Sequence, residues 1–128
     1  MSAMELKNRG DRKKMMSHVR NLVALAYADG KFSDEERQYV ANVATEVGMT
    51  ADEMKQIIND PDGIRFIMPE NDIEKIEQLY DLILLMMIDG DLNENEMIFC
   101  RAMAIKMKIP YQVGDEMVAK VINFITDN

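Results

Sequence analysis

The feature that most constrains the fold is an internal duplication at an offset of sixty residues. The segment Leu22–Gly30 reads LVALAYADG, and the segment Leu82–Gly90 reads LILLMMIDG. After each glycine come an apolar residue, a helix-capping residue and, three positions later, a glutamate. Repeats of this kind usually form supersecondary units that bury their apolar faces against each other. The sequence therefore predicts two equivalent units, about residues 12–59 and 72–124.

Apolar spacing predicts that each unit is built from helices. Apolar residues recur every three or four positions before Gly30, which favours a helix that the glycine ends. Ser33 with Glu36, and Thr50 with Glu53, have the spacing of capping boxes that begin the next two helices. The expected helices cover about residues 12–28, 34–47, 51–59, 73–88, 94–107 and 113–124, with a minor helical turn at 64–67 and a three-residue insertion before the last helix.

No segment alternates polar and apolar residues over a length that would form a strand. We therefore expect an all-α fold, a single-domain bundle of six to seven helices with an internal pseudo-twofold repeat. The domain is expected to cover residues 12–128, because 128 residues of which 48% are apolar suffice for one core. Residues 1–11 are expected to form a mobile N-terminal tail.

Charge and composition exclude several classes of function. The formal net charge is −8, whereas nucleic-acid binding needs a cationic surface, so no nucleic-acid partner is expected. Cys100 is the only cysteine and His18 the only histidine, which excludes an intrachain disulfide, the usual zinc sites and a ferritin-like di-iron site. The apolar runs are too short to span a bilayer, so we expect a cytoplasmic protein without direct membrane insertion. Cys100 falls on an apolar stripe and is read as a core residue.

The two Asp-Gly segments, 27–36 and 87–96, resemble the TerB-like family of tellurite-resistance proteins and related co-chaperone domains. Both have an apolar helix end, Asp-Gly, a variable residue, an apolar residue, a cap and a glutamate three positions after the cap. The resemblance extends over roughly Met15 to Phe124. It implies an all-α fold and a role in bacterial metal or chemical-stress responses near membrane proteins. Ile88 departs from the pattern, because the first copy has the small Ala28 there.

The resemblance also implies acidic positions that bind a divalent cation. The matching residues here are Asp29, Glu36, Asp89 and Glu96, and oxygen ligands on a turn suit Ca²⁺ or Mg²⁺. The alternative is structural, because glutamate in a capping box already has a role at the helix start. An EF-hand is excluded, since its frame puts apolar residues, such as Leu25, at ligand positions.

The leading functional hypothesis is a non-enzymatic adaptor that binds one or more protein partners, some of them membrane-associated. A second hypothesis is a metal-free interaction module with a Met-rich apolar groove between the two units, suggested by thirteen methionines. A third is a metal-assisted hydrolase, which would need Asp89 to converge with Asp29 or Asp81. The sequence shows no orienting partner for His18, so no catalytic residue is predicted.

Overall fold

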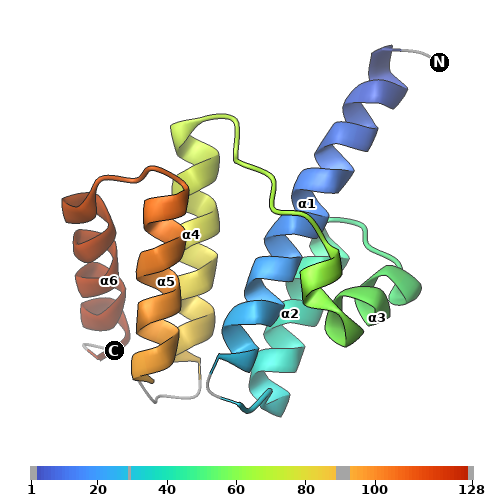
Figure 1. The fold of residues 1–128 in the computed structure, drawn as a ribbon. Coiled ribbons are helices and arrows are strands. Elements are labelled where there is room, and N and C mark those ends of the chain that lie inside the picture. Colours follow the sequence, from blue (N-terminus) through green and yellow to red (C-terminus); the bar gives the residue numbers. More distant parts are fainter. Residues whose placement is uncertain (1–2, 29, 89–92, 127–128) are drawn as a thin grey trace.

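The computed structural model describes residues 3–28, 30–88 and 93–126. Over these residues every regular element is helical, which confirms the all-α prediction (Figure 1). The elements are α1 (Ala3–Tyr27), α2 (Asp34–Glu46), α3 (Ala51–Asn59), the short 3₁₀ helix η1 (Pro61–Gly63), α4 (Asp72–Met87), α5 (Glu94–Lys106) and α6 (Tyr111–Thr126). No helix in the described part of the chain is both long enough and apolar enough to cross a membrane.

The helices form two three-helix units joined along α1 and α4. Helices α2 and α3 pack on α1, while α5 and α6 pack on α4, and α1 contacts α4 extensively (Figure 1). One continuous core links the two units, because fully buried side chains of α1 and α4 belong to a single cluster. Its side chains with no exposed surface are Val19, Leu22, Val23, Leu25, Ala26, Val40, Ile57, Leu82, Ile83, Leu85 and Met107.

The two units keep the sixty-residue register through to the last helix. Helices α2 and α5 differ by sixty residues at both ends, and α3 and α6 begin sixty residues apart, at Ala51 and Tyr111. The predicted three-residue insertion and the predicted start of the last helix near residue 113 are therefore wrong. Pro110 takes the position of the helix cap, and its carbonyl accepts hydrogen bonds from Val113 and Gly114.

The turns that end α2 and α5 have the same geometry. Gly48 has a φ of +77° and Lys108, at the equivalent position, has a φ of +59°. In each unit the next amide returns to an equivalent helix carbonyl at 2.9 Å, Met49 to Ala44 and Ile109 to Ala104. This left-handed turn is the usual C-terminal motif of a helix, and it favours glycine because a Cβ is strained there.

This equivalence predicts opposite effects at the two positions. Replacing Lys108 with glycine should raise the free energy of unfolding by about 0.5–1 kcal/mol, because it removes the left-handed strain. Replacing Gly48 with alanine should lower it by about 1 kcal/mol, although a Cβ there meets nothing within 4 Å. Urea denaturation of both variants would measure the changes. Equal stability of all three proteins would contradict the equivalence of the turns.

Helix α1 begins at Ala3, so residues 3–11, where we expected an N-terminal tail, are helical. Its first turns project beyond the other helices in Figure 1. The sequence there contains Glu5, Leu6 and Lys7, which are good helix formers. Once the packed part of α1 is formed, each further residue adds a hydrogen bond without a new nucleation cost.

The linker between the units crosses α1 and holds one short helix. That helix, η1, lies at residues 61–63 instead of the predicted 64–67, because the Asp60 carboxylate caps it by accepting from the Gly63 amide and a proline begins it. Arg20 donates to the carbonyl of Pro61 at 3.1 Å, and the Ile67 amide donates to the Ser17 hydroxyl at 2.8 Å. These bonds fix the linker to α1.

Candidate functional site

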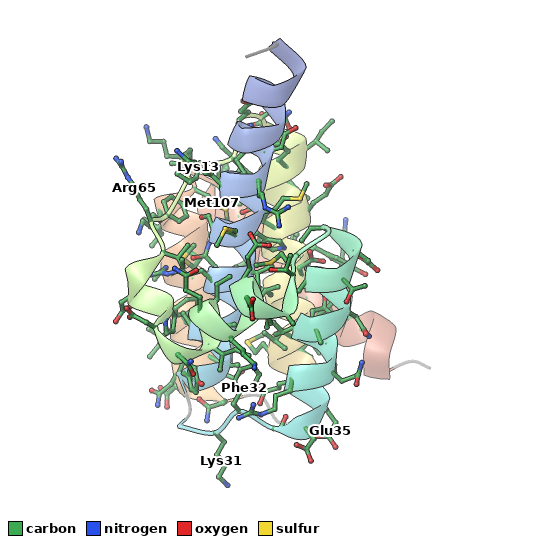
Figure 2. The ribbon with its side chains drawn as sticks, turned by 90° about the vertical axis from the view of Figure 1, so that its right-hand side faces the viewer. Lys13, Lys31, Phe32, Glu35, Arg65 and Met107 are labelled. Atoms are coloured by element: carbon green, nitrogen blue, oxygen red, sulfur yellow. The ribbon has the colours of Figure 1, made fainter. Side chains whose placement is uncertain are left out.

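The first Asp-Gly turn connects α1 to α2 at one end of the bundle. Gly30 has a φ of +81°, and its amide donates to the carbonyl of Tyr27 at 3.0 Å. Phe32 then packs edge-on against Tyr27, with ring centroids 5.2 Å apart, and the Arg37 guanidinium lies 4.6 Å from its centroid. The side chain of Lys31 extends away from the helices at this end (Figure 2). The turn is therefore anchored by Phe32 while its charged neighbour faces outward.

Glu36 is buried although it belongs to the first turn of a surface helix. Its carboxylate accepts from the Ser33 amide at 3.0 Å, and the Ser33 hydroxyl accepts from the Glu36 amide at 3.1 Å, which completes the predicted capping box. Only 1% of Glu36 is exposed, whereas its neighbour Glu35 is exposed and extends outward (Figure 2). Burial of an ionised carboxylate is costly unless charge or hydrogen bonds compensate it.

The second unit repeats the side-chain cap and the buried glutamate at the start of α5. The Asn93 side chain accepts from the amides of Asn95 and Glu96, at 2.8 and 3.2 Å. Glu96 is also only 1% exposed. Helices α1 and α4 end at the same end of the bundle, where α2 and α5 begin, so the two buried glutamates belong to that end (Figure 1).

Two of the four predicted metal ligands are thus described by the structure, and both are buried. The other two, Asp29 and Asp89, lie outside the described residues. Within the described residues, no three histidine, cysteine, aspartate or glutamate side chains form a group suited to a metal ion. The predicted cation site at the Asp-Gly turns therefore stays a prediction.

A polar cluster between α1, α2 and α4 was not predicted from the sequence. His18 Nε2 lies 2.8 Å from Asp81 Oδ2, and the Tyr39 hydroxyl donates to Asp81 Oδ1 at 3.4 Å. His18 is largely buried, and it lines a cleft of about 280 Å³ together with Asp81. The orienting partner of His18 therefore lies on the other unit, sixty-three residues away.

One signal in the sequence marks this cluster. In α1 the polar residues His18 and Asn21 lie three positions apart on an apolar stripe, and Gln78 and Asp81 lie at the equivalent positions of α4. A polar pair at matching places on both central helices indicates a polar patch where the helices meet.

The pKa of Tyr39 is raised well above its ordinary value of about 10, first by burial and then by the negative charge of Asp81. The protonated tyrosine is thus favoured in the folded state, so its contribution to stability is complete below about pH 10 and is lost as the pH rises further. We expect the free energy of unfolding to fall more steeply above pH 10 in the wild-type protein than in Tyr39→Phe. Urea denaturation from pH 8 to 11 would show this difference, and parallel curves would contradict it.

Cys100 lies in the core, as its place on the apolar stripe predicts. It is buried on α5, and burial, with a smaller effect of Glu96, raises the pKa of its thiol to about 12. A thiol that stays protonated and covered is a poor nucleophile.

The structure contains an apolar groove, but it lies within the second unit and not between the two units as predicted. It has a volume of about 420 Å³ and is lined by α4, α5 and α6. Two methionines, Met86 and Met97, contribute to the lining, but leucine, isoleucine, valine and alanine side chains contribute more. The groove is therefore aliphatic more than Met-rich.

A comparison with known proteins identifies the first unit. Residues 1–59 match the family described as tellurite resistance protein TerB. This stretch covers α1, α2 and α3, and it includes the first Asp-Gly turn with its buried Glu36. No curated protein and no solved structure matches the chain. This match over the first unit supports a TerB-like family for the chain.

Proposed function

We propose that this protein is a non-enzymatic TerB-like interaction domain whose surface responds to a divalent cation bound at the two Asp-Gly turns. The proposed setting is a bacterial stress response of the tellurite-resistance type, in the cytoplasm, with a protein partner that is membrane-associated. The observation that carries the proposal is the burial of Glu36 and Glu96, equivalent glutamates that are each 1% exposed.

The physical argument concerns the cost of burying these carboxylates. A capping glutamate on a surface helix needs only to reach its own backbone, and Glu53 does so in α3 while its side chain remains 22% exposed. Glu36 and Glu96 are instead enclosed at the end of the bundle where the acidic turns lie. A hard cation with oxygen ligands would offset the desolvation of buried carboxylates. Asp29 and Asp89 would complete the ligand set from the adjoining turns.

Thermal denaturation with Ca²⁺, Mg²⁺ or Mn²⁺ tests the proposal. At a hundredfold excess over the dissociation constant, a bound cation adds about 2.7 kcal/mol to the free energy of unfolding. We expect this rise for at least one ion in the wild-type protein. The double variant Asp29→Asn with Asp89→Asn should lose it, because the turns then lack two anionic ligands.

The matched control removes the same charge from equivalent exposed positions. Asp34 and Glu94 lie sixty residues apart in the first turns of α2 and α5, and both are exposed. The variant Asp34→Asn with Glu94→Gln should keep the ion-dependent stabilisation. Absence of a shift with every ion, or an equal shift in the Asp29/Asp89 variant, would rule out the cation site.

A metal-free interaction module is the second candidate, and one observation favours it. Ile73, Ile76 and Tyr80 form an exposed apolar stripe along α4. On α1 the position equivalent to Tyr80 is Arg20, which is covered by the linker through its bond to the Pro61 carbonyl. A face that the protein covers in one unit and exposes in the other is suited to a partner segment. This candidate predicts no response to any of the three ions.

A hydrolase is not proposed. Asp81, one of the carboxylates that such an enzyme would use, is engaged by His18 and Tyr39. Its geometry is that of a packed polar cluster at a helix interface.

A further inference from the structure

The apolar groove of the second unit exists because the two units differ at one position of their third helices. Gly114 of α6 occupies the place of Met54 in α3, where the methionine side chain packs against the core. A Cβ on Gly114 would meet only Ala104 Cβ at 3.7 Å and a Leu79 methyl group at 4.0 Å, which are ordinary contacts. The second unit therefore has free space where the first unit has a side chain.

The shape and lining of this space restrict what can fill it. Along α5 the lining extends from Met97 to Ile105, and the eight steps between these residues span about 12 Å at 1.5 Å per residue. Leu79 and Met86 of α4 and Val118 of α6 also line the groove. A volume of about 420 Å³ lies within the range of small-molecule sites and is mostly apolar, as such sites are. The groove thus suits a narrow apolar chain.

The charged residues at the edge indicate the head group. Arg101 of α5 is exposed and lines the groove, and within the described residues it takes part in none of the salt bridges. Its guanidinium is complementary to a carboxylate. Asp115 of α6 also lines the groove and acts against an anion there. Replacing Arg101 and replacing Asp115 should therefore change the affinity for an anionic ligand in opposite directions. Neither replacement should change the affinity for an uncharged ligand.

From these observations we infer that the groove between α4, α5 and α6 binds a free medium-chain fatty acid, with the chain over Leu79 and Met86 and the carboxylate at Arg101. This function goes beyond the proposed cation response and is independent of it, because none of the described residues that flank the Asp-Gly turns lines the groove. The negative net charge of the chain is no obstacle, since charges more than about 10 Å away are largely screened at physiological salt.

Titration of the full-length protein with decanoate and with decanol, followed by amide NMR shifts and calorimetry, tests the inference. Saturable binding of both ligands is expected, with the largest shifts at Gly114, Ala104 and Ala119. Arg101→Gln should weaken decanoate binding several-fold and Asp115→Asn should strengthen it. Neither change should alter the affinity for decanol.

Filling the groove provides the decisive variant. Gly114→Met should reduce the affinity for both ligands at least tenfold while the circular dichroism spectrum is unchanged, because Met54 occupies the equivalent place in the first unit. Ala119→Leu, which fills the groove from another position, serves if Gly114→Met fails to fold. Lys120→Met is the matched control, since Lys120 adjoins Ala119 but does not line the groove, and it should keep full affinity. Non-saturable binding, shifts confined to the α4 stripe, or undiminished binding in the filled variants would overturn the inference.

Discussion

Replacing Leu82 with alanine is expected to lower the free energy of unfolding by about 3–5 kcal/mol, the range for a fully buried leucine in a close-packed core. Leu82 has no exposed surface and belongs to the cluster that joins the two units. Since Leu22 occupies the equivalent place in α1 and is equally buried, Leu22→Ala should cost a similar amount. A domain of this size is stable by only about 5–15 kcal/mol, so either change removes a large part of the total.

The control for this prediction lies on the same helix. Ile73 of α4 is 71% exposed, and Ile73→Ala should change the free energy of unfolding by less than about 0.5 kcal/mol. Urea denaturation gives all three values, and the transition should stay cooperative. Two separate transitions in Leu82→Ala, or a cost below about 1 kcal/mol, would show that the units do not share one core.

The second large effect is expected at Asp81. Replacing Asp81 with alanine leaves His18 and Tyr39 without their shared acceptor between the units. The expected loss is about 3 kcal/mol, between the values for an unsatisfied polar group and for a broken buried ion pair. The loss does not reach the upper limit of that range, because part of the Asp81 side chain is exposed to water.

A double-mutant cycle measures the coupling free energy between His18 and Asp81 apart from the other contacts of the cluster. Asp81→Ala and His18→Ala should together cost less than the sum of the single changes by about 1–2 kcal/mol, as expected for residues in contact. The same cycle with Gln38, an exposed residue of α2 that bonds Asn42, should show no coupling. Additive effects at His18 and Asp81 would mean that their contact contributes nothing to stability.

The helices were predictable wherever local signals agreed with the register of the repeat. Ser33 and Thr50 each carry a glutamate three positions later, and both pairs form complete capping boxes. Gly48 ends α2 in the left-handed conformation that glycine favours. These capping motifs involve residues within one turn of helix, so they can be recognised from the sequence alone.

The predicted helix boundaries were wrong where a residue adopts a conformation that its type disfavours, or where contacts between helices determine the boundary. Lys108 adopts the conformation expected of a glycine, so the turn that follows α5 carried no recognisable signal and the register of α6 was predicted wrongly. Helix α1 begins at Ala3 instead of about residue 12, and the residues in between include good helix formers.

The candidate sites depend largely on contacts between residues that are distant in the sequence, and local motifs do not specify such contacts. Glu36 and Glu96 are each 1% exposed, and a capping motif alone does not specify this burial. The pairing of His18 with Asp81 joins residues sixty-three positions apart, and only the contact of α1 with α4 brings them together. The groove depends on Gly114, whose effect is visible only when the third helices are placed in register.

Paramagnetic relaxation by Mn²⁺ tests the cation site most directly. Substoichiometric Mn²⁺ should first broaden the amide signals of Gly30 and residues 33–36, together with those of residues 93–96, because both turns adjoin the proposed ion. Signals near the cleft that contains His18, about Glu74 to Asp81, should stay sharp at the same concentration. Broadening that begins at that cleft, or that spreads evenly over exposed carboxylates, would contradict a cation at the duplicated turns.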